Sequence, residues 1–177
     1  MKTSVINPLI LLSFLSMLLP GITFAANLAG QVEKVSGTAW GQLGDEPRRQ
    51  LEQGSPFYVS DTLTTEAEST LELRFEDKTK FFVGPDAELA VEEFIYNSAD
   101  RENSFSSRIL KGTFRFVTGL IAREKPEDME VNTSVATIGV RGTQVVGEAA
   151  ATSATIILLE PEDKSRNSII QVANQYG

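Results

Sequence analysis

Residues 70–83 read TLELRFEDKTKFFV, and their alternation decides the fold class. Leu71, Leu73 and Phe75 fall on one face of an extended chain, and charged residues fall on the other, because successive side chains of a β-strand point to opposite sides. The polar residues 77–79 interrupt the pattern before a second apolar run resumes it. This order predicts two half-buried strands joined as a hairpin.

The same period of two extends through most of the chain after residue 25. Residues 88–96 (ELAVEEFIY) form a further predicted strand, with Leu89 and Val91 on one face. Residues 155–159 (TIILL) are apolar on both faces, which is typical of a central strand covered on both sides. Short strands separated by turns, without a sustained helical period, predict an all-β fold. We expect stacked short strands in a twisted β-solenoid or β-helix-like arrangement, with a β-sandwich as the alternative.

A glycine-threonine pair recurs at three places near the start or bend of a predicted strand. The three pairs are Gly37-Thr38, Gly112-Thr113 and Gly142-Thr143. Such a recurrence favours stacked coils of chain over a sandwich.

The first 25 residues have the pattern of a secretory signal peptide. Lys2 gives a short basic start, residues 8–20 are almost wholly apolar, and small residues precede a cleavage point after Ala25. The apolar run is shorter than the roughly 20 residues needed to span a bilayer, and the chain has no cysteine to be acylated as in a lipoprotein. We therefore predict a signal peptide at 1–25, a domain at 26–177, no membrane insertion after cleavage, and a periplasmic or secreted location.

The charge and composition exclude several functions. The chain has a net charge of −8, and loss of residues 1–25 removes one basic residue and no acid, which gives −9. Such a chain is repelled by phosphate backbones, so nucleic acid is not an expected partner. With no histidine and no cysteine, the chain has no Ser-His or Cys-His nucleophile pair and no histidine-ligated zinc site. We expect no cofactor.

Residues 135–146 read VATIGVRGTQVV, with an arginine between two glycines inside a strand-like run. Alternation places one set of side chains on one face (Thr137, Gly139, Arg141, Thr143) and another set on the opposite face (Ile138, Val140, Gly142). A phosphate-binding loop needs a third glycine, a lysine and a following helix, and none is found here. Glycine within a strand marks a bulge, a bend or a close approach, and the donors of arginine can hold a neighbouring turn. We predict that Gly139, Val140, Arg141, Gly142 and Thr143 form a structural corner, with ligand contact as the alternative.

Carboxylates are numerous, and their pairs have two interpretations. The pairs are Glu66/Glu68, Glu72/Glu76 and Glu92/Glu93, with a further group at Glu160, Glu162 and Asp163. A glycosidase needs two carboxylates about 5–9.5 Å apart, one of them with a pKa raised by burial. In an acidic protein such pairs are more often surface charge, and we predict no catalytic or metal-binding residue, with calcium at residues 160–163 as the alternative. Trp40 and the phenylalanines are expected in the core rather than in a platform for sugar rings.

Several segments carry a family resemblance when they are taken in order. They are Leu51-x-x-Gly54, residues 59–65 (VSDTLTT), residues 71–77 (LELRFED), residues 82–85 (FVGP), residues 110–112 (LKG) and residues 137–143 (TIGVRGT). Together they resemble the FecR family, an exported β-rich sensor domain, most strongly over residues 50–146. The resemblance marks Asp61, Thr64, Gly84 and Pro85 as motif positions beside residues 139–143. Ser60 and Lys78 stand where the family has glycine.

The resemblance implies a binding or sensing role without catalysis. Regulatory members of the family carry a cytoplasmic anti-sigma segment and a transmembrane helix ahead of this domain, whereas a signal peptide precedes it here, so we expect a stand-alone form. We predict a partner protein in the cell envelope that pairs with an exposed strand edge at residues 168–177. The alternatives are an envelope component that self-associates into homo-oligomers through the same edges, and a carboxylate-dependent polysaccharide hydrolase.

Overall fold

The structure, a computed structural model, describes residues 26–97, 102–141, 144–159 and 169–174, and this part of the chain is built almost wholly of strands. The strands are β1 (Leu28–Ser36), β2 (Ala39–Leu43), β3 (Arg49–Gln50), β4 (Pro56–Tyr58), β5 (Asp61–Thr65), β6 (Thr70–Phe75), β7 (Lys80–Val83), β8 (Glu88–Ile95), β9 (Ser104–Val117), β10 (Met129–Thr133), β11 (Ala136–Arg141), β12 (Gln144–Ala150), β13 (Ser153–Leu159) and β14 (Ile169–Asn174). The helices are α1 (Leu120–Glu124) and the 3₁₀ turn η2 (Pro126–Asp128). The predicted all-β class is confirmed.

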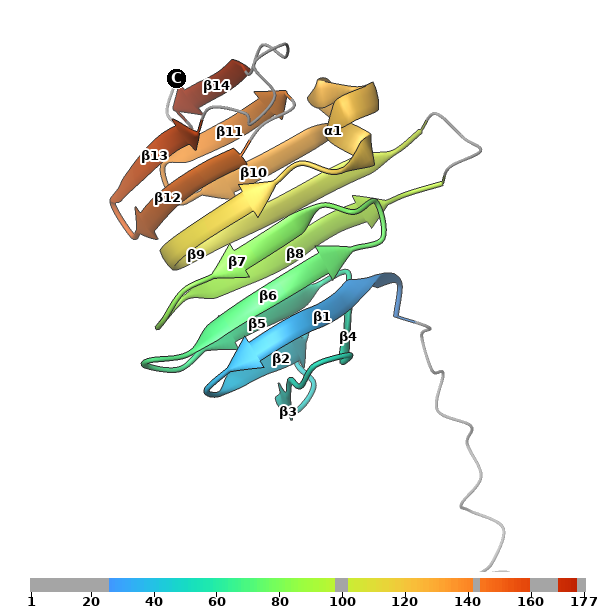
Figure 1. Cartoon of the computed structure of the whole chain (residues 1–177), viewed down its shortest axis with the longest axis vertical. Helices are drawn as coiled ribbons and strands as arrows, with labels where there is room; N and C mark the ends of the chain where they lie inside the picture. The colour runs from blue at the N-terminus through green and yellow to red at the C-terminus, as the bar shows by residue number, and fades with distance from the viewer. Residues whose placement is uncertain (1–25, 98–101, 142–143, 160–168, 175–177) are drawn as a thin grey trace, which may run out of the picture.

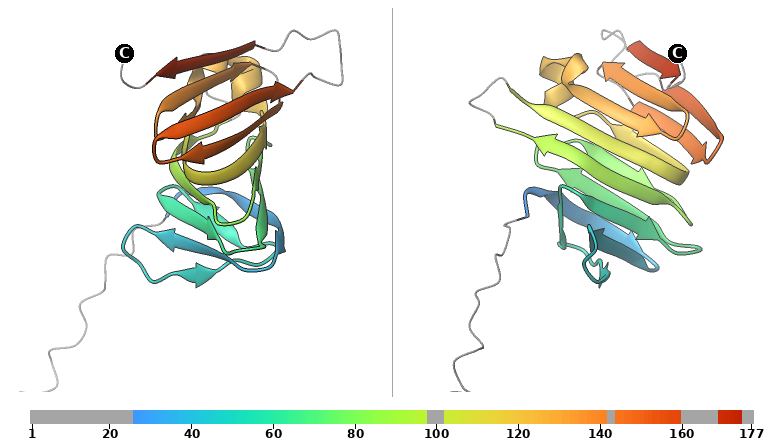
Figure 2. Two further views of the ribbon diagram at one scale, coloured as in Figure 1. Left: turned by 90° about the vertical axis from the view of Figure 1, so that its left-hand side faces the viewer. Right: turned by 180° about the vertical axis from the view of Figure 1, so that it is seen from behind.

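The strands form two facing layers that are joined through β9. Sheet A runs in the order β4-β1-β6-β7-β9-β12-β13, and sheet B runs in the order β3-β2-β5-β8-β9-β10-β11-β14. Figure 1 shows the strands stacked roughly in chain order, from β1 and β2 at one end to β13 and β14 at the other. Neighbouring strands are antiparallel except for the parallel pair β9–β10, so the stack differs from a β-helix of parallel coils. The two layers curl around a common core (Figure 2).

Two of the glycine-threonine pairs lie where the chain passes from one sheet to the other. Gly37 has a φ of +79° between β1 of sheet A and β2 of sheet B. Gly112 has a φ of +94° at the bend of β9, whose first part pairs with β8 and whose last part pairs with β7. The third pair, Gly142-Thr143, is outside the described residues, but it is flanked by β11 of sheet B and β12 of sheet A. Within the described residues, the recurrence thus marks two of the passages between the sheets.

Alternation along the strands fills the space between the layers with apolar side chains. Leu71 and Leu73 of β6 are fully buried, as the pattern of residues 70–83 predicts. The ring of Phe75 in sheet A lies 4.8 Å from the ring of Phe105 in sheet B and 4.9 Å from that of Phe57. Burial of one such side chain contributes about 1.5–3 kcal/mol. The described phenylalanines other than Phe82 all belong to this core.

Two of the predicted placements are wrong. Residues 155–159 do not form a central strand, because β13 pairs only with β12 among the described residues and Ile157 is 52% exposed. Trp40 does not enter the core: Ala39 and Gly41 take the buried positions of β2, which leaves Trp40 half-buried on the outer face. The apolar composition of residues 155–159 did not show that they form an edge strand. The aromatic character of Trp40 did not show which face of β2 is covered.

A buried polar contact holds the single α-helix of the described chain against the β6–β7 turn. The side chain of Asp77 accepts hydrogen bonds from the backbone N–H (3.0 Å) and the hydroxyl (2.8 Å) of Thr79. The Thr79 hydroxyl in turn accepts from the backbone N–H of Gly119 at 3.0 Å, and the Asp77 carbonyl accepts from that of Leu120 at 2.8 Å. These contacts place α1 so that Ile121 is buried. In the described residues no helix is long and apolar enough to cross a membrane.

Candidate functional site

Asp61, the first motif residue, is a structural anchor. Its carboxylate is fully buried and accepts two hydrogen bonds from the guanidinium of Arg49, one from Nη1 at 2.9 Å and one from Nη2. It accepts a third hydrogen bond from the backbone N–H of Tyr58 at 2.7 Å. The guanidinium lies 5.4 Å from the centroid of the Tyr58 ring. The hydrogen bond to Asp61, partly opposed by burial, raises the pKa of Arg49 above its ordinary value. Asp61 is therefore fully engaged in joining β3, β4 and β5.

Gly84 and Pro85 form the turn that packs against the bend of β9. The backbone N–H of Gly84 donates to the Thr113 carbonyl at 2.9 Å, and a Cβ on Gly84 would lie 2.1 Å from the Thr113 hydroxyl. The hydroxyl of Thr65 donates to the Gly84 carbonyl at 2.6 Å and accepts from the N–H of Ala87 at 3.0 Å. The turn is thus fixed on both sides, and both backbone polar groups of Gly84 are bonded within the fold.

Thr64 lies elsewhere, on the outer face of sheet B. It is half-buried on β5 and lines a hollow with Trp40 of β2 and Glu88 of β8. The structure therefore separates the motif positions: Asp61 is buried, Gly84 is half-buried in a turn against β9, and the side chain of Thr64 lies on the outer face of sheet B.

The motif of residues 139–143 spans the passage from β11 in sheet B to β12 in sheet A. Ile138 and Val140 are buried, and Gly139 lies on the outer face, as alternation predicts. Gly139 sits in regular pairing with β10 and β14, without a bulge and without a positive φ. The side chain of Arg141 and the residues Gly142 and Thr143 are outside the described part. No helix follows the motif, because β12 begins at Gln144.

Gly139 forms part of the floor of an open groove of about 640 Å³ at the outer face of sheet B. The groove is lined from η2, β10, β11 and β14, with Glu127 and Glu130 on one side and Gln171 on the other. A Cβ on Gly139 would meet only ordinary contacts, the nearest being the Cβ of Gln171 at 3.8 Å. Packing within the chain therefore does not require glycine here, in contrast to Gly84.

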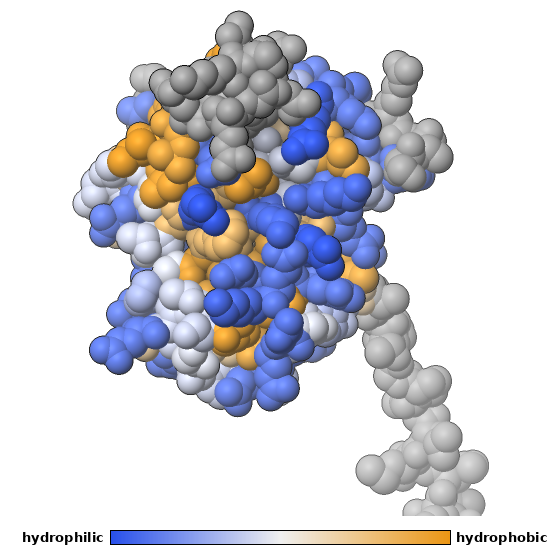
Figure 3. Space-filling model, viewed as in Figure 1, coloured by the Kyte–Doolittle hydropathy of each residue, from blue (hydrophilic) through white to orange (hydrophobic). Residues whose placement is uncertain are grey.

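The C-terminal end of the stack leaves part of its core uncovered by the described residues. Ile156 and Leu158 of β13 and Ile170 of β14 face inward but remain only partly buried. Val172, whose register partner Ile138 is fully buried, is 53% exposed. Figure 3 shows apolar surface gathered over β12 and β13. At the opposite end of the stack, Leu51 and Phe57 are buried and close the core.

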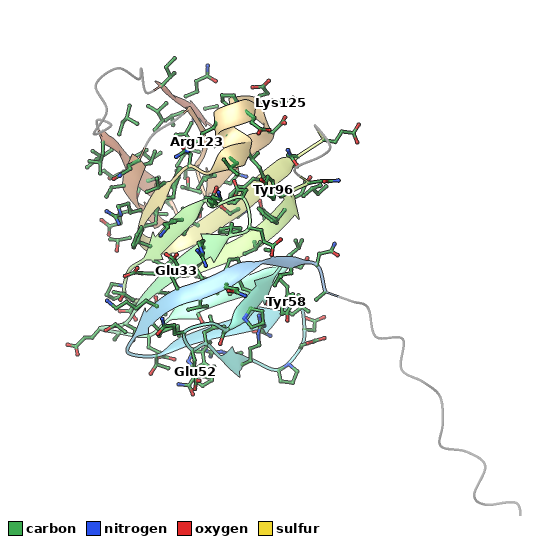
Figure 4. The ribbon with its side chains drawn as sticks, turned by 45° about the vertical axis from the view of Figure 1, so that its right-hand side comes forward. Glu33, Glu52, Tyr58, Tyr96, Arg123 and Lys125 are labelled. Atoms are coloured by element: carbon green, nitrogen blue, oxygen red, sulfur yellow. The ribbon has the colours of Figure 1, made fainter. Side chains whose placement is uncertain are left out.

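Several carboxylates at the surface of the described part of the chain pair with cations. Glu33, on β1 of sheet A (Figure 4), lies 2.9 Å from the Lys80 ammonium and 3.4 Å from Nε of Arg74. Glu92 binds Arg108 at 2.6 Å, and Glu72 lies 4.0 Å from Lys34. No cluster of three or more acidic ligands that could hold a metal ion occurs in the part of the chain that the structure describes. The candidate calcium turn at 160–163 and the cleavage point at Ala25 are outside that part.

Sequence reasoning missed Arg49 as the partner of Asp61 and Trp40 as a surface residue. Pairs such as Arg49–Asp61 have no local signature, since the two residues are 12 positions apart and meet only through the β3–β5 arrangement. The alternation of β2 carried a signal for Trp40, because a small Ala39 and Gly41 flank it.

Comparisons with known proteins give one match. The family model described as FecR protein matches residues 61–161, more than half of the chain. Neither the curated proteins nor the solved structures gave a significant match.

Proposed function

The chain belongs to the FecR protein family, and we propose that it is an exported, non-catalytic module that recognises a partner protein in the cell envelope through the C-terminal end of its strand stack. The family is one of sensing and regulatory modules associated with the cell envelope. Within that role, the open end of the stack is the surface best suited to binding another protein.

The observation that carries the proposal is the pair of strand edges at this end. In the described chain β13 pairs only with β12, and β14 pairs only with β11. An edge strand presents alternate N–H and C=O groups that a strand from another chain can continue. An added strand would also cover Val172 and the half-buried inner side chains of β13, so backbone pairing and apolar burial would favour the same complex.

The groove over Gly139 extends this surface along the outer face of β14. A bound segment that continues sheet B beyond β14 would run beside the groove, which is lined by Ile169, Gln171 and Ala173 of that strand. Because no packing within the chain requires glycine at 139, the open floor is available to a side chain of the partner.

The test compares charged substitutions at the proposed end with a matched one elsewhere. Val172→Lys and Ile157→Lys place a charge on the exposed edge strands, and Ile95→Lys on β8 is the control because Ile95 and Ile157 are both 52% exposed. We expect covalent cross-linking in intact cells to give a discrete adduct with a second protein for the unchanged chain and for Ile95→Lys. The adduct should be lost from Val172→Lys and Ile157→Lys.

Two outcomes would contradict the proposal. Adducts that persist in both edge variants would place the binding surface elsewhere. Adducts that contain only this chain, together with concentration-dependent oligomers in size-exclusion chromatography, would identify a self-associating envelope component instead.

A further inference from the structure

A hollow on the outer face of sheet B, near the closed end of the stack, is not explained by partner binding at the other end. It measures about 320 Å³ and is bounded by side chains of β2, β5, β8 and β9. The strand register aligns four of them in one row: Trp40 opposite Thr64, Thr64 opposite Glu88, and Glu88 opposite Lys111. With neighbouring strands about 4.8 Å apart, the row extends over about 14 Å.

Trp40 is held in this row as a fixed aromatic surface. Its indole Nε1 donates to Oε1 of Glu66 at 2.9 Å, and the guanidinium of Arg48 lies 5.0 Å from the ring centroid. Arg48 is itself 52% exposed, so a ligand can displace it from the ring without disturbing the core. A half-buried tryptophan with a fixed orientation offers a flat apolar surface beside polar groups.

The polar side chains around Trp40 are of three kinds: positively charged, negatively charged and uncharged. Thr62, Thr64 and Gln42 supply hydroxyl and amide groups, and Lys111 supplies an ammonium group. Three carboxylates, those of Glu66, Asp86 and Glu88, outnumber the two cations of the hollow, Arg48 and Lys111. This balance disfavours polyanions, and the single aromatic group is too small a surface for a purely apolar ligand.

We propose that this hollow binds an uncharged glycan, of hexose or N-acetylhexosamine units, laid across strands β2, β5, β8 and β9. A sugar ring has an apolar C–H face that can pack on Trp40, and its hydroxyls can donate to Glu88 and accept from Lys111 and Thr64. The row is long enough for a short oligosaccharide. The site is separate from the proposed partner surface at β13 and β14.

The experiment uses the fluorescence of Trp40, which is the only tryptophan in the chain. The folded protein is titrated with the uncharged tetrasaccharides of glucose and of N-acetylglucosamine, and with a sulfated oligosaccharide as the anionic probe. We expect a saturable change in emission with at least one uncharged probe and none with the sulfated one. The better of the two uncharged probes identifies the type of sugar unit.

Two variants locate the site. Thr64→Val keeps the fluorophore and the side-chain shape but removes the hydroxyl, and should weaken binding by up to roughly tenfold. Thr155→Val on the exposed face of β13 is the matched control and should leave the affinity unchanged. Absence of a saturable change with either uncharged probe at millimolar concentration, a preference for the sulfated probe, or equal affinity in Thr64→Val and the unchanged chain would overturn the proposal. Loss of partner cross-linking in the edge variants would not affect any of these results.

Discussion

Arg49 and Asp61 form an ion pair with two hydrogen bonds, in which the Asp61 side chain is fully buried and the Arg49 side chain is about one-third exposed. The pair joins the short strand β3 to the start of β5, and a third hydrogen bond from the N–H of Tyr58 ties in β4. The hydrogen bond to Asp61, partly opposed by burial, raises the pKa of Arg49 above its ordinary value. The contact thus ties three short segments together at the closed end of the stack.

Asp61→Asn should lower the free energy of unfolding by about 2 kcal/mol, because it removes the charge that pairs with Arg49 while keeping the side-chain shape. Chemical denaturation measures the change. The control is Glu72→Gln, whose partner Lys34 lies 4.0 Å away and is largely exposed, and which should change stability by less than about 0.5 kcal/mol. Equal effects of the two substitutions would show that Asp61 does not anchor the strands.

Gly112→Ala tests the bend of β9. A Cβ at this position would lie 2.4 Å from the Cβ of Ala87, and the φ of +94° is strained for any side chain, so we expect a loss of about 3 kcal/mol. Gly54 has a similar φ of +85° with no atom within 4 Å of the added Cβ, and Gly54→Ala should cost only about 1 kcal/mol. The difference between the two melting curves isolates the clash at the bend. If the curves coincide, β9 does not pack as described.

Lys78→Gly and Ser60→Gly should each stabilise the protein by about 0.5–1 kcal/mol. Both residues have a positive φ, +71° for Lys78 and +72° for Ser60, a conformation that glycine adopts without the steric cost of a Cβ. The resemblance to the FecR family also implies glycine at both positions. Glu148→Gly is the control and should destabilise, because Glu148 lies in the middle of β12 in regular pairing with both neighbouring strands, where glycine weakens a strand. Thermal unfolding shows whether each substitution raises or lowers the melting temperature.

Thr79→Val should destabilise by about 2 kcal/mol. The hydroxyl donates to Asp77 and accepts from the N–H of Gly119, and valine would leave both buried groups without this partner. Thr155→Val, at an exposed position of β13, should change stability little. Amide exchange of residues 119–122 should also accelerate in Thr79→Val, and unchanged exchange there would contradict the described attachment of α1.

The predictions from local periodicity were the successful ones. The alternation of residues 70–83 gave the β6–β7 hairpin and its buried face correctly, since burial on one side of a strand is a local property. The same alternation gave Leu89 and Val91 as buried residues of β8. It did not reveal the irregularity between Val91 and Glu93, which leaves Glu92 and Glu93 both exposed and returns Phe94 to the core.

The features that sequence reasoning missed depend on contacts between distant segments. The edge position of β13 depends on which strands pair, and the apolar run of residues 155–159 gave the opposite expectation. Trp40 was expected in the core because aromatic residues usually are, yet its face of β2 turns outward. Both residues 155–159 and Trp40 belong to surfaces for which binding is proposed, the first to the partner surface and the second to the glycan site.

Amide hydrogen exchange of the module with and without its cross-linked partner tests strand pairing at the open end most directly. We predict slower exchange across residues 153–158 or 169–173 in the complex, with β2 and β5 unchanged, because an added strand engages the edge amides of β13 or β14. Unchanged exchange at both edges, with slower exchange confined to another face of the stack, would contradict partner binding by strand pairing at β13 or β14.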